Sequence, residues 1–141
     1  MTKKELLEGL RARISPEERS LLAAGEGLVI SEHNRAAALE LLEASASEGE
    51  VPEGEIARLE EILTGYLAEM LPEKPEAWKW IVLGCVYLSY IARRPMHPIE
   101  RAGIQVRTEG GETVYFCPLR SPEADTACHF CVCRPLGEAQ A

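Results

Sequence analysis

Hydrophobic residues recur every three or four positions through the first two-thirds of the chain, the spacing that places side chains on one face of an α-helix. The pattern predicts helices over residues 3–14 and 16–24, and another from Ser31 or Asn34 to about Ala46. It is clearest over residues 56–71, where apolar side chains form a wide stripe made of Ile56, Leu59, Ile62, Leu63, Tyr66, Leu67, Met70 and Leu71.

Local signals mark the beginning of the second helix. Ser15 is suited to an N-cap, Pro16 to the first helical position and Glu18 to the partner position of a capping box.

Residues 76–93 are apolar nearly all round, which is typical of a central helix covered on every side. The longest apolar run within that helix, residues 80–92, is shorter than the roughly 20 residues that a membrane span needs. We therefore expect a buried helix and no membrane association.

The spacing of the apolar residues changes after Arg94 and Pro95. Residues 104–108 alternate apolar and polar side chains, two glycines follow in a turn, and residues 113–117 resume a strand-like run. This pattern predicts a β-hairpin. The predicted fold class is therefore mainly α: a bundle of about five helices with a C-terminal β-hairpin and a Cys/His metal knuckle. We expect a single domain, 1–141, with the bundle over 1–94 and the hairpin and cysteine-rich tail over 95–141.

Charge narrows the range of partners. The chain has a net charge of −8, and all of it arises in residues 1–80, while residues 81–141 are neutral. An acidic surface repels phosphate backbones and anionic lipid, so neither nucleic acid nor a membrane surface is an expected partner. The N-terminus lacks the apolar segment of a signal peptide, and the number of cysteines, five, is odd. Both features predict a reducing, cytoplasmic location without a disulfide framework.

Four of the five cysteines fall in the last 25 residues, as Cys117, Cys128, Cys131 and Cys133. Cys128-His129-Phe130-Cys131 is a C-x-x-C knuckle, a spacing that lets both sulfurs face one point and supply half of a tetrahedral site. Cys117, at the end of a predicted strand, is the expected third ligand. The isolated Cys85 is interpreted as an inert buried thiol.

The fourth ligand is open between three residues. His97 is the first choice and gives three thiolates and one imidazole; Cys133 would give an all-thiolate site, and His129 is the third choice. A mixed thiolate and imidazole set points to zinc first. An iron–sulfur cluster on the four C-terminal cysteines is the second choice. The tail has few apolar residues to bury, and a structural zinc is worth roughly 10 kcal/mol or more of folding free energy in small domains.

The segment over residues 95–133 resembles an uncharacterised archaeal family associated with methanogens, domain of unknown function 2115. The resemblance rests on His97-Pro98, the hairpin, Phe116-Cys117-Pro118 and the motif from Ala127 to Val132. It departs from the family at residues 99–103, Ile-Glu-Arg-Ala-Gly, where a glycine-rich stretch is expected. The resemblance implies an archaeal source and leaves Cys133 as an addition of this chain. It marks as the shared ligand set His97, Cys117, Cys128 and Cys131.

Two functions from different classes follow. The first is a small metal-binding protein that is not an enzyme, in which a closed structural zinc site pins the tail and the protein presents a surface to a protein partner. The second is an iron–sulfur or open-site metal redox protein, or an enzyme of anaerobic metabolism, with His97 or His129 as acid or base. A thiol oxidoreductase is the weakest alternative, because no βαβ unit precedes Cys128. His33 is interpreted as a surface residue.

Overall fold

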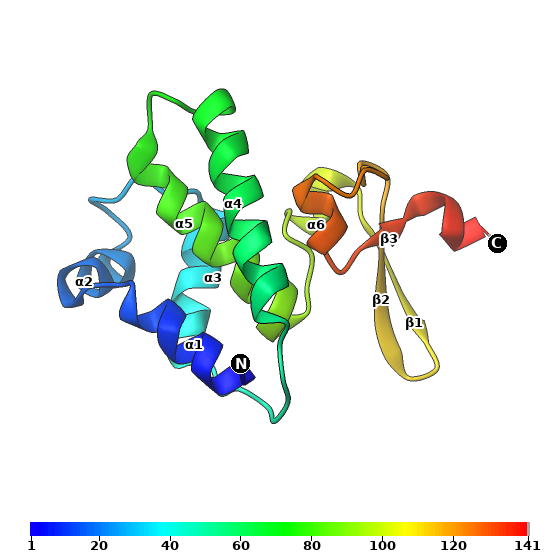
Figure 1. Ribbon diagram of the computed structural model, residues 1–141, viewed down its shortest axis with the longest axis horizontal. Coiled ribbons are helices and arrows are strands. Elements are labelled where there is room, and N and C mark those ends of the chain that lie inside the picture. The colour runs from blue at the N-terminus through cyan, green and yellow to red at the C-terminus, as the bar shows by residue number, and fades with distance from the viewer. Residues whose placement is uncertain (141) are drawn as a thin grey trace.

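The computed structural model describes residues 1–140 and confirms that the chain is mainly helical, with a small C-terminal sheet. Five main helices gather at one end of the molecule, and the sheet lies at the other (Figure 1). The helices are α1 (Lys3–Ala12), α2 (Pro16–Ala24), α3 (Glu32–Glu43), α4 (Glu53–Met70) and α5 (Pro75–Tyr87), the last of which continues as a π-helical turn, Leu88–Ala92.

Side-chain caps fix the beginnings of the first three helices. The hydroxyl of Ser15 accepts a hydrogen bond from the backbone N–H of Glu18, whose carboxylate accepts one from the N–H of Ser15, so the predicted capping box is confirmed. A second box, between Thr2 and Glu5, begins α1. The hydroxyl of Ser31 accepts a hydrogen bond from the N–H of Asn34, which decides the cap of α3 in favour of Ser31.

Helix α5 is central, as predicted. It packs against both α3 and α4, and the fully buried large aliphatic side chains come from these helices and from α2. The largest fully buried side chain, Phe116, lies in the hairpin. Burial of each large aliphatic side chain contributes about 1.5–3 kcal/mol to folding. The core of the helical body therefore rests on a small set of fully covered residues, which includes Leu22, Leu41, Leu59, Leu83 and Val86.

One part of the predicted α4 stripe is not core. Ile56, Leu59, Leu63 and Leu67 are buried, but Tyr66 is 57% and Met70 62% exposed. The stripe is wider than the surface that α5 and the 3₁₀ helix Ala127–Phe130 cover, so its margin is left in contact with solvent. Tyr66 and Met70 therefore belong to the predicted apolar stripe but not to the core.

The end of α5 departs from regular helix. The π-helical turn is followed by Arg93, which has a φ of 56° and is the one non-glycine residue with positive φ in residues 1–140. The N–H of Arg94 donates to the carbonyl of Leu88 at 2.8 Å, and the chain then turns toward the buried residues Pro95 and Met96. This turn directs the following segment, including His97, along the outside of the helical body.

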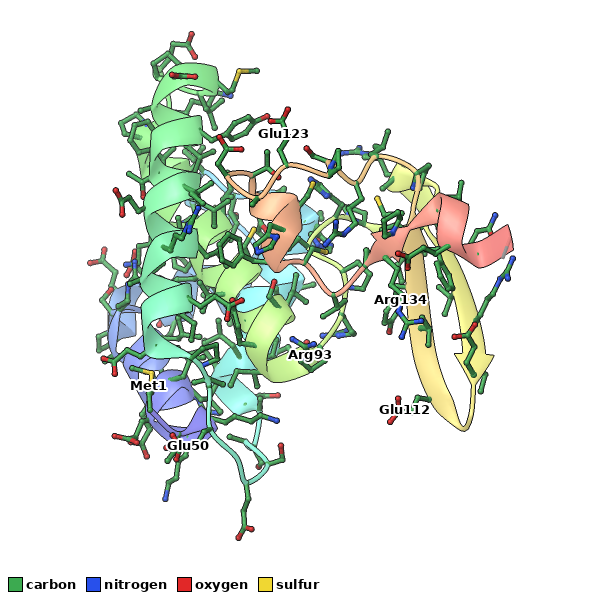
Figure 2. The ribbon with its side chains drawn as sticks, turned by 45° about the vertical axis from the view of Figure 1, so that its right-hand side comes forward. Met1, Glu50, Arg93, Glu112, Glu123 and Arg134 are labelled. Atoms are coloured by element: carbon green, nitrogen blue, oxygen red, sulfur yellow. The ribbon has the colours of Figure 1, made fainter. Side chains whose placement is uncertain are left out.

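The predicted hairpin is confirmed. Strands β1 (Gln105–Glu109) and β2 (Glu112–Cys117) pair antiparallel through Gly110 and Gly111, both with positive φ, as a type I′ turn requires. The hairpin extends away from the helices, with Glu112 near its tip (Figure 2). A third strand, β3 (Arg134–Pro135), pairs parallel to β2; the sequence does not predict it, because two residues carry no periodicity.

The remaining tail elements are short. They are α6 (Ile99–Ala102) and two 3₁₀ helices, Ala127–Phe130 and Leu136–Gln140. Phe130 is buried in the main hydrophobic cluster, and its 3₁₀ helix lies beside α4. A second, smaller cluster holds Ile104, Cys117 and Cys133. Of the helices in residues 1–140, none is long and apolar enough to cross a bilayer.

Candidate functional site

The sheet brings two of the C-terminal cysteines into one apolar cluster. Cys117 ends β2, and its backbone lies opposite Pro135 of β3, two residues after Cys133. Cys117 and Cys133 are both buried there with Ile104. The Nε of Arg120 donates a hydrogen bond of 2.7 Å to the carbonyl of Cys133, which fixes the path of the chain at this point.

Cys131 lies where this cluster meets the helical body, since it packs against both hydrophobic clusters. The pKa of its thiol is lowered, first because the Cys133 thiol donates a hydrogen bond to its sulfur. Backbone N–H groups of Cys133 and Met96 and the charge of His97 act in the same direction, and burial opposes them. The same hydrogen bond raises the pKa of Cys133. Cys131 is therefore the more readily ionised thiol of the pair.

The Met96 peptide is held on both sides. Its N–H donates to the Cys131 sulfur, and its carbonyl lies 2.8 Å from the Nε2 of His33 at the beginning of α3. A carbonyl only accepts, so His33 carries its proton on Nε2. The interpretation of His33 as a surface residue is wrong: it is half-buried and fixes the segment that carries His97. Its sequence context, a helix cap, gave no signal of a partner 63 residues away.

Cys128 lies in the 3₁₀ helix Ala127–Phe130. Its 3₁₀ helix is closed by hydrogen bonds from the N–H of His129 to the carbonyl of Thr126 and from the N–H of Cys131 to the carbonyl of Cys128. Cys128 is half-buried and lines a cleft together with His97 and Cys85. His129 is exposed and lies edge-on to Phe130, with ring centroids 5.1 Å apart.

The predicted ligands are therefore brought to one region but not to one point. Cys131 contacts Cys133, Cys117 lies beside Cys133, and His97 is close enough to Cys131 to affect its charge. Within the described part of the chain, no three His, Cys, Asp or Glu side chains form a group that could hold a metal ion, and the predicted metal knuckle is not shown. The ligand set and the choice of zinc or iron–sulfur remain predictions.

Cys85 agrees with its interpretation as a buried thiol. It belongs to the main hydrophobic cluster, and burial is the first cause that raises the pKa of its thiol, to about 12. A thiol with so high a pKa is protonated at neutral pH, when it is a poor nucleophile and a poor metal ligand. Cys85 lines the same cleft as Cys128 but is buried, whereas Cys128 is half-buried.

The fold and these residues define a mainly helical protein with a cysteine-rich segment and a small sheet docked on its helical body. Residues 13–136 match the model of a family described as an uncharacterized protein conserved in archaea (DUF2115). The match covers most of the chain, which therefore belongs to this family.

One relative is the UPF0305 protein MJ0646 of Methanocaldococcus jannaschii. It is 30% identical to this chain over 59 residues, which make up 38% of this chain and 35% of that protein. The chain therefore matches only about a third of the relative's length. No solved structure matches this chain.

Proposed function

We propose that this protein binds one zinc ion through His97, Cys117, Cys128 and Cys131, and that the ion fixes the C-terminal segment on the helical body. The joined surface then serves to bind a protein partner. Cys133 is the alternative fourth ligand. The observation that carries the proposal is that none of residues 118–129 is buried, although buried residues precede and follow them.

Residues 118–126 of this segment form neither helix nor strand, and the 3₁₀ helix Ala127–Phe130 follows them directly. Leu119 is 70% exposed, so even the large apolar side chain that the segment contains does not anchor it. The proposed ligands Cys117 and Cys131 bracket this segment, and Cys128 lies within the 3₁₀ helix at its end. A tetrahedral ion shared by these three thiols would supply the stabilisation that packing does not.

The surroundings of Cys131 suit a ligand sulfur. Backbone N–H groups of Met96 and Cys133 point at it, and such hydrogen bonds stabilise a thiolate and orient a ligand. His97 is exposed and Cys128 is half-buried, so both side chains have room to rotate toward Cys131. Metal binding would then draw together the side chains that the fold already holds in one region.

The direct test is elemental analysis of protein purified without oxygen and without a metal-affinity tag. We expect about one zinc per chain, as a closed structural site holds one ion, and colourless protein. Cys117→Ser, Cys128→Ser, Cys131→Ser and His97→Ala are expected to lose zinc. The matched controls Cys85→Ala and His129→Ala are expected to retain it.

The remaining outcomes separate the alternatives. Loss of zinc in Cys133→Ser with retention in His97→Ala would establish the all-thiolate site. Iron with sulfide and brown protein would replace the proposal by an iron–sulfur protein. Protein free of any metal after growth in zinc- and iron-supplemented medium would contradict both.

A further inference from the structure

A large cleft separates the helical body from the C-terminal segment. Its volume is about 1660 Å³. One wall comes from the beginning of α3 and the outer face of α4, and the other from the segments 96–101 and 121–128. Figure 2 shows the second wall, where the segment that carries Glu123 crosses from the sheet toward α4. This volume is larger than that of a typical small-molecule pocket, which is roughly 300–1,000 Å³.

The lining of the cleft is acidic. Five carboxylates face two arginines, Arg58 and Arg101, which gives a net charge of −3 with the histidines neutral. Glu32 has only a 3.8 Å contact with the side chain of Arg35. Within residues 1–140 the other four carboxylates form no ion pair and their side chains make no hydrogen bond: Glu61, Glu69, Glu100 and Asp125. Most of this negative charge is therefore uncompensated.

The same cleft has apolar surface between the charges. Tyr66 projects from the exposed margin of α4, and Met70 continues that margin one turn further along the helix. Ile62, Ile81 and Met96 lie deeper. Exposed apolar surface rimmed by charges is typical of a protein interaction site. Tyr66, one of the two exposed residues of the α4 stripe, thus lines the cleft.

We propose that this cleft binds a basic segment of a partner protein, in which lysine or arginine side chains flank one or more apolar residues. The carboxylates on both walls would pair with the cationic side chains, while Tyr66 and the deeper apolar residues would receive the apolar ones. Complementary charge of this kind accelerates association and makes it sensitive to salt. The inference deepens the proposed function and rests on it in one respect, because the metal would hold the second wall in place.

The test begins with selection from a random-peptide phage library on the full-length protein as purified. We expect the selected peptides to be enriched in lysine and arginine next to apolar residues and to bind more weakly as salt is raised. Enrichment of acidic or uncharged peptides, or no enrichment at all, would overturn the inference.

Variants then locate the binding site. Glu61→Lys combined with Glu69→Lys reverses two exposed charges on the cleft wall and is expected to weaken binding of the selected peptides by about tenfold or more. The matched control, Glu17→Lys with Glu26→Lys, makes the same change of charge on and beside α2, outside the cleft, and is expected to change binding by less than about twofold at physiological salt. Equal loss in both variants would show that net charge, and not this cleft, is responsible.

The metal content of the same preparations separates the two proposals. Zinc-containing protein that selects no basic peptide would overturn the inference and leave the zinc site standing. Suppose instead that the protein is metal-free, and that its selected basic peptides bind more weakly to the variant Glu61→Lys with Glu69→Lys. That result would overturn the zinc site and leave the inference about the cleft standing.

Discussion

The helical body and the C-terminal segment are held together by different means. In the body, large apolar side chains from several helices are fully covered, and side-chain caps begin α1, α2 and α3. In the tail, order rests on two buried phenylalanines, Phe116 and Phe130, on a small cluster around two cysteines, and on arginines that donate to backbone carbonyls. The body therefore has the core of an ordinary domain, whereas the tail has anchors at isolated points.

Removal of the proposed metal is expected to have the largest effect on the stability of the tail relative to the helical body. A strong chelator should raise amide hydrogen exchange across residues 117–133 by several orders of magnitude, because structural zinc contributes roughly 10 kcal/mol or more. Amides of α4 and α5 should keep their protection, which hydrogen exchange with mass spectrometry measures. Unchanged exchange in the tail would show that it does not depend on a metal.

Phe130→Ala is expected to release the tail at its apolar anchor. The side chain is buried in the main cluster, and loss of a buried phenylalanine costs about 3–5 kcal/mol. Hydrogen exchange should rise in the tail far more than in α5. The control is the exposed neighbour, His129→Ala, which should leave the exchange pattern intact. Equal loss of protection in both regions would mean that body and tail unfold as one unit.

Leu83→Ala tests the core of the helical body and the dependence of the tail on it. Leu83 is fully buried in α5, so its truncation should lower the free energy of unfolding by about 2–5 kcal/mol. Denaturant unfolding followed by circular dichroism measures the change. The tail depends on the body for its docking surface, so this variant should also release the tail. A tail that keeps its protection while α5 loses it would contradict this dependence.

Glu18→Gln removes the ion pair between α2 and α5. The Glu18 carboxylate accepts a 2.7 Å hydrogen bond from Lys79, which is the largest cause of its lowered pKa, followed by the backbone N–H of Ser15. The folded-state pKa lies below the unfolded one, so the stabilisation is present above the unfolded pKa and is lost as the pH falls through the folded pKa. We expect a loss of about 1 kcal/mol at neutral pH for this partly exposed group.

Denaturant unfolding at neutral and at acidic pH checks this expectation. The variant and the wild type should converge at acidic pH, where the carboxylate is protonated. Glu17→Gln is the control, because Glu17 neighbours the pair without belonging to it. A difference that persists unchanged at acidic pH would show that packing, and not charge, is responsible.

Tyr66→Ala should have the smallest effect on stability. The side chain is 57% exposed, so the free energy of unfolding should change by less than about 0.5 kcal/mol. Binding of the selected basic peptides should nevertheless weaken. Denaturant unfolding and peptide titration of one preparation measure both quantities. A stability loss as large as that of a core variant would place Tyr66 in the core of the body and not in a binding surface.

The helices and the hairpin were predictable because their signals are local. Apolar spacing identified α1, α3, α4 and α5, the Ser15-Pro16-Glu18 pattern identified the beginning of α2, and the paired glycines identified the turn at Gly110 and Gly111. Each signal lies within one element, where backbone geometry alone relates the residues to one another. Family membership was predictable for the same reason, since the motifs that carry it are short and continuous.

Only the tertiary structure decided how the cysteines and histidines are arranged. Sequence spacing joins Cys128 with Cys131, and the fold adds Cys133, which lowers the pKa of the Cys131 thiol. The contact of His33 with the Met96 carbonyl, the pairing of β3 with β2 and the exposure of Tyr66 also join or separate residues far apart in the chain. The sequence by itself determined the main helices, the hairpin and the family to which the chain belongs. The mutual positions of these elements depend on how they pack, which no local pattern encodes.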